Sequence, residues 1–173
     1  MNEAPMADTE DGWEAAGPGW FVVNLKESAY TRCEGFGQYS PTETVKFAEF
    51  GVGVHVLQPG EPNGLYHAEG NQEAFLVLSG ECLLLVEGEE RLLRRWDFFH
   101  CPGGTRHIFV GAGDGPCAIF MVGTRASREL VYPVDPVAVK HGAGVTQEAH
   151  SSKEAYPPRT FTRAPYLPGS LEP

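Results

Sequence analysis

Short apolar runs alternate with turn residues between residues 45 and 123. The runs are rich in Val, Leu and Phe, and Pro-Gly or Gly-rich segments such as 102–104 and 111–116 separate them. This rhythm, with no long helical period, is typical of an all-β sandwich or barrel. The predicted strands are Val45–Phe50, Gly53–Leu57, Ala74–Leu78, Cys82–Glu87, Arg91–Leu93, His107–Val110 and Ala118–Val122.

The flanking segments differ from this core in composition. Residues 1–19 are acidic and rich in Ala, Gly and Pro, which predicts a disordered leader. Trp20–Leu25 is apolar and β-prone, so we expect a first strand there, followed by a loop over 27–41. We therefore predict three parts: a leader (1–19), a barrel (20–126) and an extension (127–173) that packs on the barrel or on a partner subunit.

The extension holds half of the chain's 14 prolines and cannot form a long helix or a regular sheet. Asp135 followed by Pro136 can open a short helix, with Asp as N-cap, and Gly142 can end it. Ser152–Tyr156 can form a second helical turn. The rest of the extension is predicted to be an extended tail.

Charge and cysteine content narrow the function classes. The formal net charge is −10 and no basic run occurs, which argues against nucleic-acid or anionic membrane partners. The four cysteines form no Cys-x-x-Cys pair, and the first residues lack the apolar stretch of a signal peptide. No apolar run reaches the ~20 residues of a membrane helix. We expect a cytoplasmic protein with reduced thiols.

Four potential metal ligands lie at close spacing within the barrel region. His67 and Glu69 are two residues apart, so on a strand they share one face, and Glu73 opens the next strand. Glu73 shares a face with apolar residues, where a lone carboxylate needs a partner. His107 follows a Pro-Gly turn some thirty residues later. Imidazole and carboxylate ligands suit one divalent ion, with Fe, Mn, Zn and Ni all open.

These two stretches resemble the two conserved motifs of the cupin superfamily. In the first, Glu69 stands where the family has its second His, while His67, Glu73 and Gly80 match. In the second, Pro102, Gly104 and His107 match, whereas Trp96 and Gly111 occupy the family's first Gly and last Asn positions. The resemblance covers roughly residues 45–123, and the spacings agree in both motifs and in order.

The resemblance implies a cupin-type double-stranded β-helix, or jelly-roll barrel, that is often dimeric and holds a metal ion. It implies His67, Glu73 and His107 as ligands. Glu69 either joins them or swings away and leaves a coordination position open for water or substrate. In the second case Glu69 is the candidate catalytic base.

Other residues near the motifs have a structural and a functional interpretation. His55 lines the cavity or is a hydrogen-bonded wall residue, and either His100 or Cys101 can reach the site or simply pack. Tyr66 is predicted to point away from the ligands. A further set faces inward and either lines an apolar pocket or fills the barrel. It comprises Phe75, Val77 and Phe109.

The first functional hypothesis is a metal-dependent oxidoreductase, dioxygenase-like, acting on a small organic molecule. A metal-dependent isomerase or decarboxylase is a related alternative. A non-catalytic module that binds a metal or small ligand is a second class, and an empty barrel kept for assembly is a third. We also predict a homodimer, with Trp20–Leu25 as the element exchanged between subunits.

Overall fold

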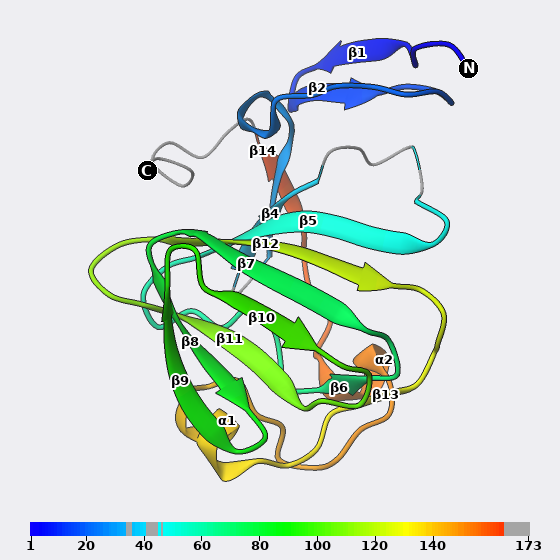
Figure 1. The fold of residues 1–173 in the computed structure, drawn as a ribbon. Helices are drawn as coiled ribbons and strands as arrows, with labels where there is room; N and C mark the ends of the chain where they lie inside the picture. Colours follow the sequence, from blue (N-terminus) through cyan, green and yellow to red (C-terminus); the bar gives the residue numbers. More distant parts are fainter. Residues whose placement is uncertain (34–35, 41–44, 46, 165–173) are drawn as a thin grey trace.

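The computed structural model describes residues 1–33, 36–40, 45 and 47–164. Its centre is a barrel of two facing antiparallel sheets (Figure 1). The larger sheet has the order β10 (Phe98–Cys101), β7 (Glu73–Ser79), β12 (Cys117–Thr124), β5 (Phe50–Leu57), β4 (Phe36–Tyr39), β3 (Tyr30–Cys33) and β14 (Thr162–Ala164). The smaller sheet has the order β11 (His107–Ala112), β8 (Glu81–Val86) and β9 (Glu89–Arg94). The all-β prediction is confirmed, as are the predicted strands from Gly53 onward.

The barrel interior follows from strand alternation. Glu73, Phe75 and Val77 lie on the inner face of β7, and register sets them beside the inward residues of β10 and β12. One end of the interior is filled by a dense cluster between the two sheets. Its buried members are Leu57, Phe75, Val77, Cys82, Leu84, Cys101, Phe109, Cys117 and Ile119. Phe75, Val77 and Phe109 therefore fill the barrel, which is the packing interpretation of these residues.

Parts of the outer faces of both sheets are also covered. Beneath the smaller sheet, Tyr66, Leu85 and Ile108 pack with Ala138 of α1 (Pro136–Lys140), which lies on that side in Figure 1. The helix begins as predicted, because the Asp135 side chain accepts from the backbone N–H groups of residues 137 and 138. Burial of both sheet faces explains why the strands read as continuous apolar runs.

Two predicted strands near the N-terminus are wrong. In 45–50, residue 46 lies outside the described residues, and of the others only Phe50 is in a strand, where it opens β5. In Trp20–Leu25, Trp20 makes a single bridge with Glu3 and Leu25 opens the 3-10 helix η1 (Leu25–Glu27). Phe21 and Val23 are half-buried beside β5 and β12 around a groove without joining a ladder, whereas Val22 is 80% exposed.

Regular structure also occurs where none was expected. Residues 1–19, predicted as a disordered leader, contain the hairpin β1 (Met6–Thr9) and β2 (Gly12–Ala15), and Ala4 and Ala15 are buried. The described part of the predicted loop 27–41 holds β3 and β4. β10 was missed because its four residues run directly into a proline turn. Each of these strands has only four residues, too few for a clear apolar alternation.

The described part of the extension, residues 127–164, returns to its own barrel. β13 (Leu130–Val131) pairs with β6 (Ala68–Glu69), and β14 pairs with β3. The second predicted helical turn is α2 (Ser152–Ala155), and the Tyr156 hydroxyl after it accepts from the Leu65 N–H. β6, β13 and α2 gather at one end of the barrel in Figure 1. No helix among the described residues is long and apolar enough to cross a membrane.

Candidate metal centre

Three strands bring the candidate ligands together at the end of the barrel where β6, β13 and α2 lie. His67 immediately precedes β6, Glu73 opens β7 and His107 opens β11. His67 and His107 form an antiparallel bridge, with backbone N–H to carbonyl distances of 3.2 and 2.8 Å. The Pro102–Gly104 turn lies against β6, because the Gly104 N–H donates to the Glu69 carbonyl at 2.6 Å. Gly104 adopts φ +88°, which glycine tolerates best.

Backbone carbonyls set the tautomer of both histidines. The His67 Nδ1 lies 2.7 Å from the Leu65 carbonyl, and the His107 Nδ1 lies 3.1 Å from the Thr105 carbonyl. A carbonyl only accepts, so each Nδ1 carries the proton and each Nε2 keeps its lone pair. This is the arrangement in which metal-binding histidines are usually held, with one nitrogen anchored and the other free to ligate.

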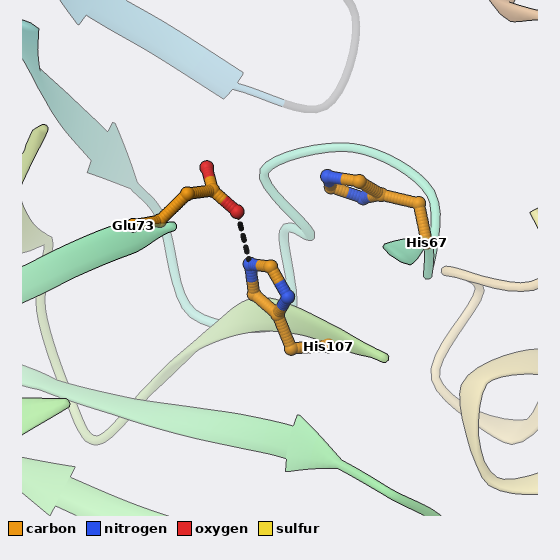
Figure 2. A group of neighbouring side chains, drawn as sticks. All are labelled: His67, Glu73 and His107. Carbon is orange, nitrogen blue, oxygen red and sulfur yellow. Dashed lines mark ion pairs between the residues drawn. The ribbon is translucent and has the colours of Figure 1, made fainter. Parts of the chain in front are cut away.

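The side chains of His67, Glu73 and His107 turn toward one another (Figure 2), and one ligand atom from each lies within 4.8 Å of the others. The His107 Nε2 is 3.5 Å from the Glu73 Oε2. Two ligands about 2.1 Å from one tetrahedral ion stand roughly 3.4 Å apart, so this separation fits a shared ion. The donor set and the exposed lone pairs thus fit a divalent metal.

Glu69 lies beside this group rather than within it. Its Oε1 is 3.7 Å from the His67 Nε2, and its other oxygen is 3.4 Å from the Asn71 side-chain amide. Side-chain exposure rises from 3% for His107 through 17% for Glu73 and 19% for His67 to 34% for Glu69. The centre therefore opens toward solvent on the side of Glu69.

Burial shifts the protonation of the three clustered groups. Desolvation, and then the charge of His67, lower the pKa of His107 to about 4. Burial also lowers the pKa of His67, and this outweighs the opposing effect of Glu69. Burial and then the Glu69 charge raise the pKa of Glu73 to about 7. Both imidazoles are consequently neutral at pH 7, which is the form that binds metals, and the His–Glu contacts are not charged ion pairs.

A cavity of about 490 Å³ extends from the glutamates. Its floor crosses β7, β12 and β5, where the positions in register with Glu73 are Gly123 and Gly51. The residues lining it are Gln38, Gly51, Val52, Gly53, His55, Glu69, Asn71, Glu73, Met121, Val122, Gly123, Thr124, Arg125, Ser127 and Arg128. Its size is that of a small-molecule site.

The sequence analysis missed several of these residues. Asn71 is buried, and its side chain donates to the Ser127 carbonyl and accepts from the Ser127 N–H. This pair ties the loop after β12 to the loop that carries the ligands. Arg125 and Arg128 enter the cavity from the same loop. No motif marks them, because they meet the site only through the pairing of β12 with β5 and β7.

Of the remaining candidate residues, some line the cavity and others pack in the core or lie at the surface. His55 lines the cavity and is also hydrogen-bonded, with its Nε2 3.0 Å from the Gln38 Oε1. Cys101 is buried in the barrel core with its sulfur 3.5 Å from the His107 Nδ1, whereas His100 is exposed on edge strand β10. Tyr66 points away from the ligands into the outer core, as predicted, and its hydroxyl accepts from the Gly88 N–H.

Comparison with known proteins agrees with this architecture. The cupin domain model matches residues 53–123. No protein of curated function matches the chain. A crystal structure from Acidithiobacillus ferrooxidans aligns at 23% identity and a TM-score of 0.50, covering 56% of this chain and 62% of that one.

Two further solved structures show the same fold. The sugar phosphate isomerase of the cupin superfamily from Silicibacter pomeroyi aligns at 21% identity and a TM-score of 0.50, covering 80% and 84% of the two chains. The polyketide cyclase RemF from Streptomyces resistomycificus aligns at 15% identity and a TM-score of 0.55, covering 65% and 84%. With both motifs in place at the mouth of a two-sheet barrel, residues 53–123 form a cupin domain.

Proposed function

We propose that the chain binds one divalent metal ion through His67, Glu73 and His107 and acts as a metal-dependent enzyme on a small organic molecule. The observation that carries the proposal is the convergence of two unprotonated Nε2 atoms and one carboxylate at the edge of a 490 Å³ cavity. Two histidines and one carboxylate form the ligand set of non-haem Fe(II) oxygenases, so a dioxygenase-like oxidoreductase is the first candidate reaction.

The chain's own residues supply binding, orientation and exclusion of water. When bound, the metal would polarise substrate oxygen atoms and, as Fe(II), would support reactions with O₂. The rings of Phe75 and Phe99 stand 5.3 and 5.8 Å from the His107 ring and close the site from the barrel interior. The open side faces the cavity, so substrate enters past Glu69.

Glu69 favours a second candidate, an isomerase or decarboxylase-type reaction that moves a proton. Its carboxylate lies at the cavity wall, outside the clustered ligand atoms, and Asn71 orients it. A carboxylate held at this distance from the ligands can accept a proton from a substrate carbon whose acidity the metal increases. Glu69 is therefore the proposed base.

Metal content measured by mass spectrometry tests the site itself. The wild-type chain, purified and dialysed against a trace of chelator, is expected to retain about one equivalent of metal. His67→Ala and His107→Ala should each lose most of it, whereas His100→Ala, which removes an exposed histidine, should not. Equal metal content in all four proteins would contradict the site.

Activity measurements then separate the function classes. Oxygen uptake with a panel of small phenols and keto acids tests the oxygenase, and exchange of substrate C–H for deuterium, followed by NMR, tests the proton-transfer enzyme. Strong thermal stabilisation by a ligand with no turnover in either assay would instead indicate a binding module.

A further inference from the structure

We propose that the molecule bound in this cavity carries an anionic oxygen group, a phosphate or a carboxylate, and that Arg125 and Arg128 bind that group. The inference rests on the proposed function, because it names the substrate class of the same site.

Three inward positions form a row across neighbouring strands. Glu73 of β7 is paired with Gly123 of β12, and Gly123 is paired with Gly51 of β5. Adjacent strands lie about 4.8 Å apart, so Gly51 stands roughly 10 Å from Glu73 across the sheet. The Arg125 guanidinium lies over Gly51, since a Cβ placed there would be 3.5 Å from its Nη2. Arg125 thus marks one end of the cavity floor and Glu73 the other.

The two glycines keep the space between these ends open. A Cβ at Gly123 would lie 3.2 Å from the Glu73 Cγ, closer than ordinary packing allows. A Cβ at Gly51 would be in ordinary van der Waals contact with Arg125, and a longer side chain would occupy the floor beneath the guanidinium. A small molecule can therefore lie along the floor with oxygen atoms near the metal ligands and its far end beneath the guanidinium.

Neither arginine side chain has a hydrogen-bond or ion-pair partner among the described residues. Within the described parts of the chain, no carboxylate pairs with the guanidinium of Arg125 or Arg128, although the chain carries a net charge of −10. Four other arginines of the described residues do pair with carboxylates, among them Arg106 with Glu87. Two unpaired guanidinium groups at one cavity suit a planar or tetrahedral oxyanion, which arginine binds with two parallel hydrogen bonds.

Charge balance favours the same ligand class. Glu69 and Glu73 offset a divalent ion, which leaves the two arginines as the net charge of the loaded cavity, formally +2. A phosphate monoester, or a carboxylate that also presents a metal-binding oxygen, neutralises this charge. A neutral polyol does not, and leaves both cations unsatisfied.

Calorimetric titration of the purified full-length chain with three matched probes tests the inference. Glycerol 1-phosphate, glycerate and glycerol share a three-carbon skeleton and differ in the anionic group. Each is titrated into wild type, Arg125→Ala, Arg128→Ala, the double variant and Arg95→Ala. Arg95 is the control, because it removes the same charge from an exposed guanidinium that lies over the Trp96 ring, away from the cavity.

We expect at least one anionic probe to bind wild type about tenfold or more tightly than glycerol, and the double variant to lose that advantage. Arg95→Ala should retain it. The preference between phosphate and carboxylate identifies the source of the anion. Equal binding of all three probes to wild type, or equal losses in the double variant and Arg95→Ala, would overturn the inference.

Metal content, measured on the same samples, separates the two proposals. The arginine variants are expected to keep wild-type metal content, because neither arginine is among the clustered ligands. A wild type without metal would contradict the proposed function, and the probes would then be compared on that metal-free chain. Absence of any arginine-dependent anion binding there would overturn the inference on its own terms.

Discussion

At the scale of single residues, the centre is defined by which atoms the backbone leaves free. The Leu65 and Thr105 carbonyls engage Nδ1 of His67 and His107 and leave both Nε2 atoms free to ligate, that of His107 at 3.5 Å from Glu73. Glu69, two residues from His67, is held by Asn71 instead. The two glutamates are close in sequence, yet their environments predict different roles.

Replacing each glutamate by glutamine distinguishes these roles. Glu73→Gln is expected to lower metal affinity at least tenfold, because an amide oxygen carries no charge to offset the ion. Glu69→Gln should retain metal content within about twofold and lose turnover if Glu69 is the base. Metal content and activity measured on both proteins check this, and loss of metal in Glu69→Gln would instead make Glu69 a ligand.

Because His55 is half-buried in the folded chain, we expect it to make the free energy of unfolding depend on pH, independently of the metal ligands. Burial lowers its pKa to about 4, below the unfolded value of 6.5. Between these values the unfolded state binds more protons, so the contribution of His55 is complete above pH 6.5 and is lost as pH falls toward 4. His55→Gln, which cannot be protonated, should therefore reduce the loss of unfolding free energy at low pH by about 1 kcal/mol. The value is modest because the side chain is only half-buried.

Urea unfolding at pH 7.5 and 4.5 measures this effect in His55→Gln and wild type. Carboxyl groups titrate in both proteins, so the difference between them isolates His55. His100→Gln, at an exposed histidine, serves as the control and should behave as wild type. An identical pH dependence in all three proteins would contradict the interpretation.

At the scale of elements, turns decide where the strands begin and end. The strand-turn rhythm predicted β7, β8, β9, β11 and β12, because each combines an apolar run with a Gly or Pro boundary. Gly111, read as a turn position, instead lies within β11, where a Cβ would be 2.1 Å from the Gln58 carbonyl oxygen. Trp96 does occupy a turn, at φ +75°, a conformation that favours glycine.

Trp96→Gly is therefore expected to stabilise the fold by about 1 kcal/mol. The tryptophan is 66% exposed in the single chain, so the monomer loses little packing, and its contact with Arg95 is exposed as well. Thermal or urea unfolding at a concentration at which the chain is monomeric checks the sign. Trp13→Gly, which lacks the positive φ and lies in β2, should destabilise the chain, and a loss of stability in Trp96→Gly would contradict the argument.

At the scale of the whole molecule, the barrel leaves apolar side chains on two neighbouring sheet edges. Leu92 of β9, Trp96 of the connecting turn and Phe98 of β10 are each more than 60% exposed. β9 and β10 are the outermost strands of their sheets. Exposed apolar edges are commonly covered by a second subunit, so the homodimer remains a prediction.

Light scattering at micromolar concentration checks the oligomeric state. The wild type is expected to have twice the mass of the 18.8 kDa chain. Leu92→Glu combined with Phe98→Glu should yield monomers if this edge is the interface, whereas Val134→Glu, an exposed apolar residue elsewhere, should not. A monomeric wild type would contradict the prediction.

The sequence by itself determined the all-β class, most central strands, the helix opened by Asp135 and the grouping of His67, Glu73 and His107, because local alternation, turn chemistry and motif spacing encode these features. It did not determine the strands of the first forty residues, which are four residues long each and contain no continuous apolar run. It also did not reveal the cavity. Gly51, Gly123 and Arg125 are distant or unremarkable in sequence, and only the pairing of β5, β12 and β7 places them in one row beside Glu73.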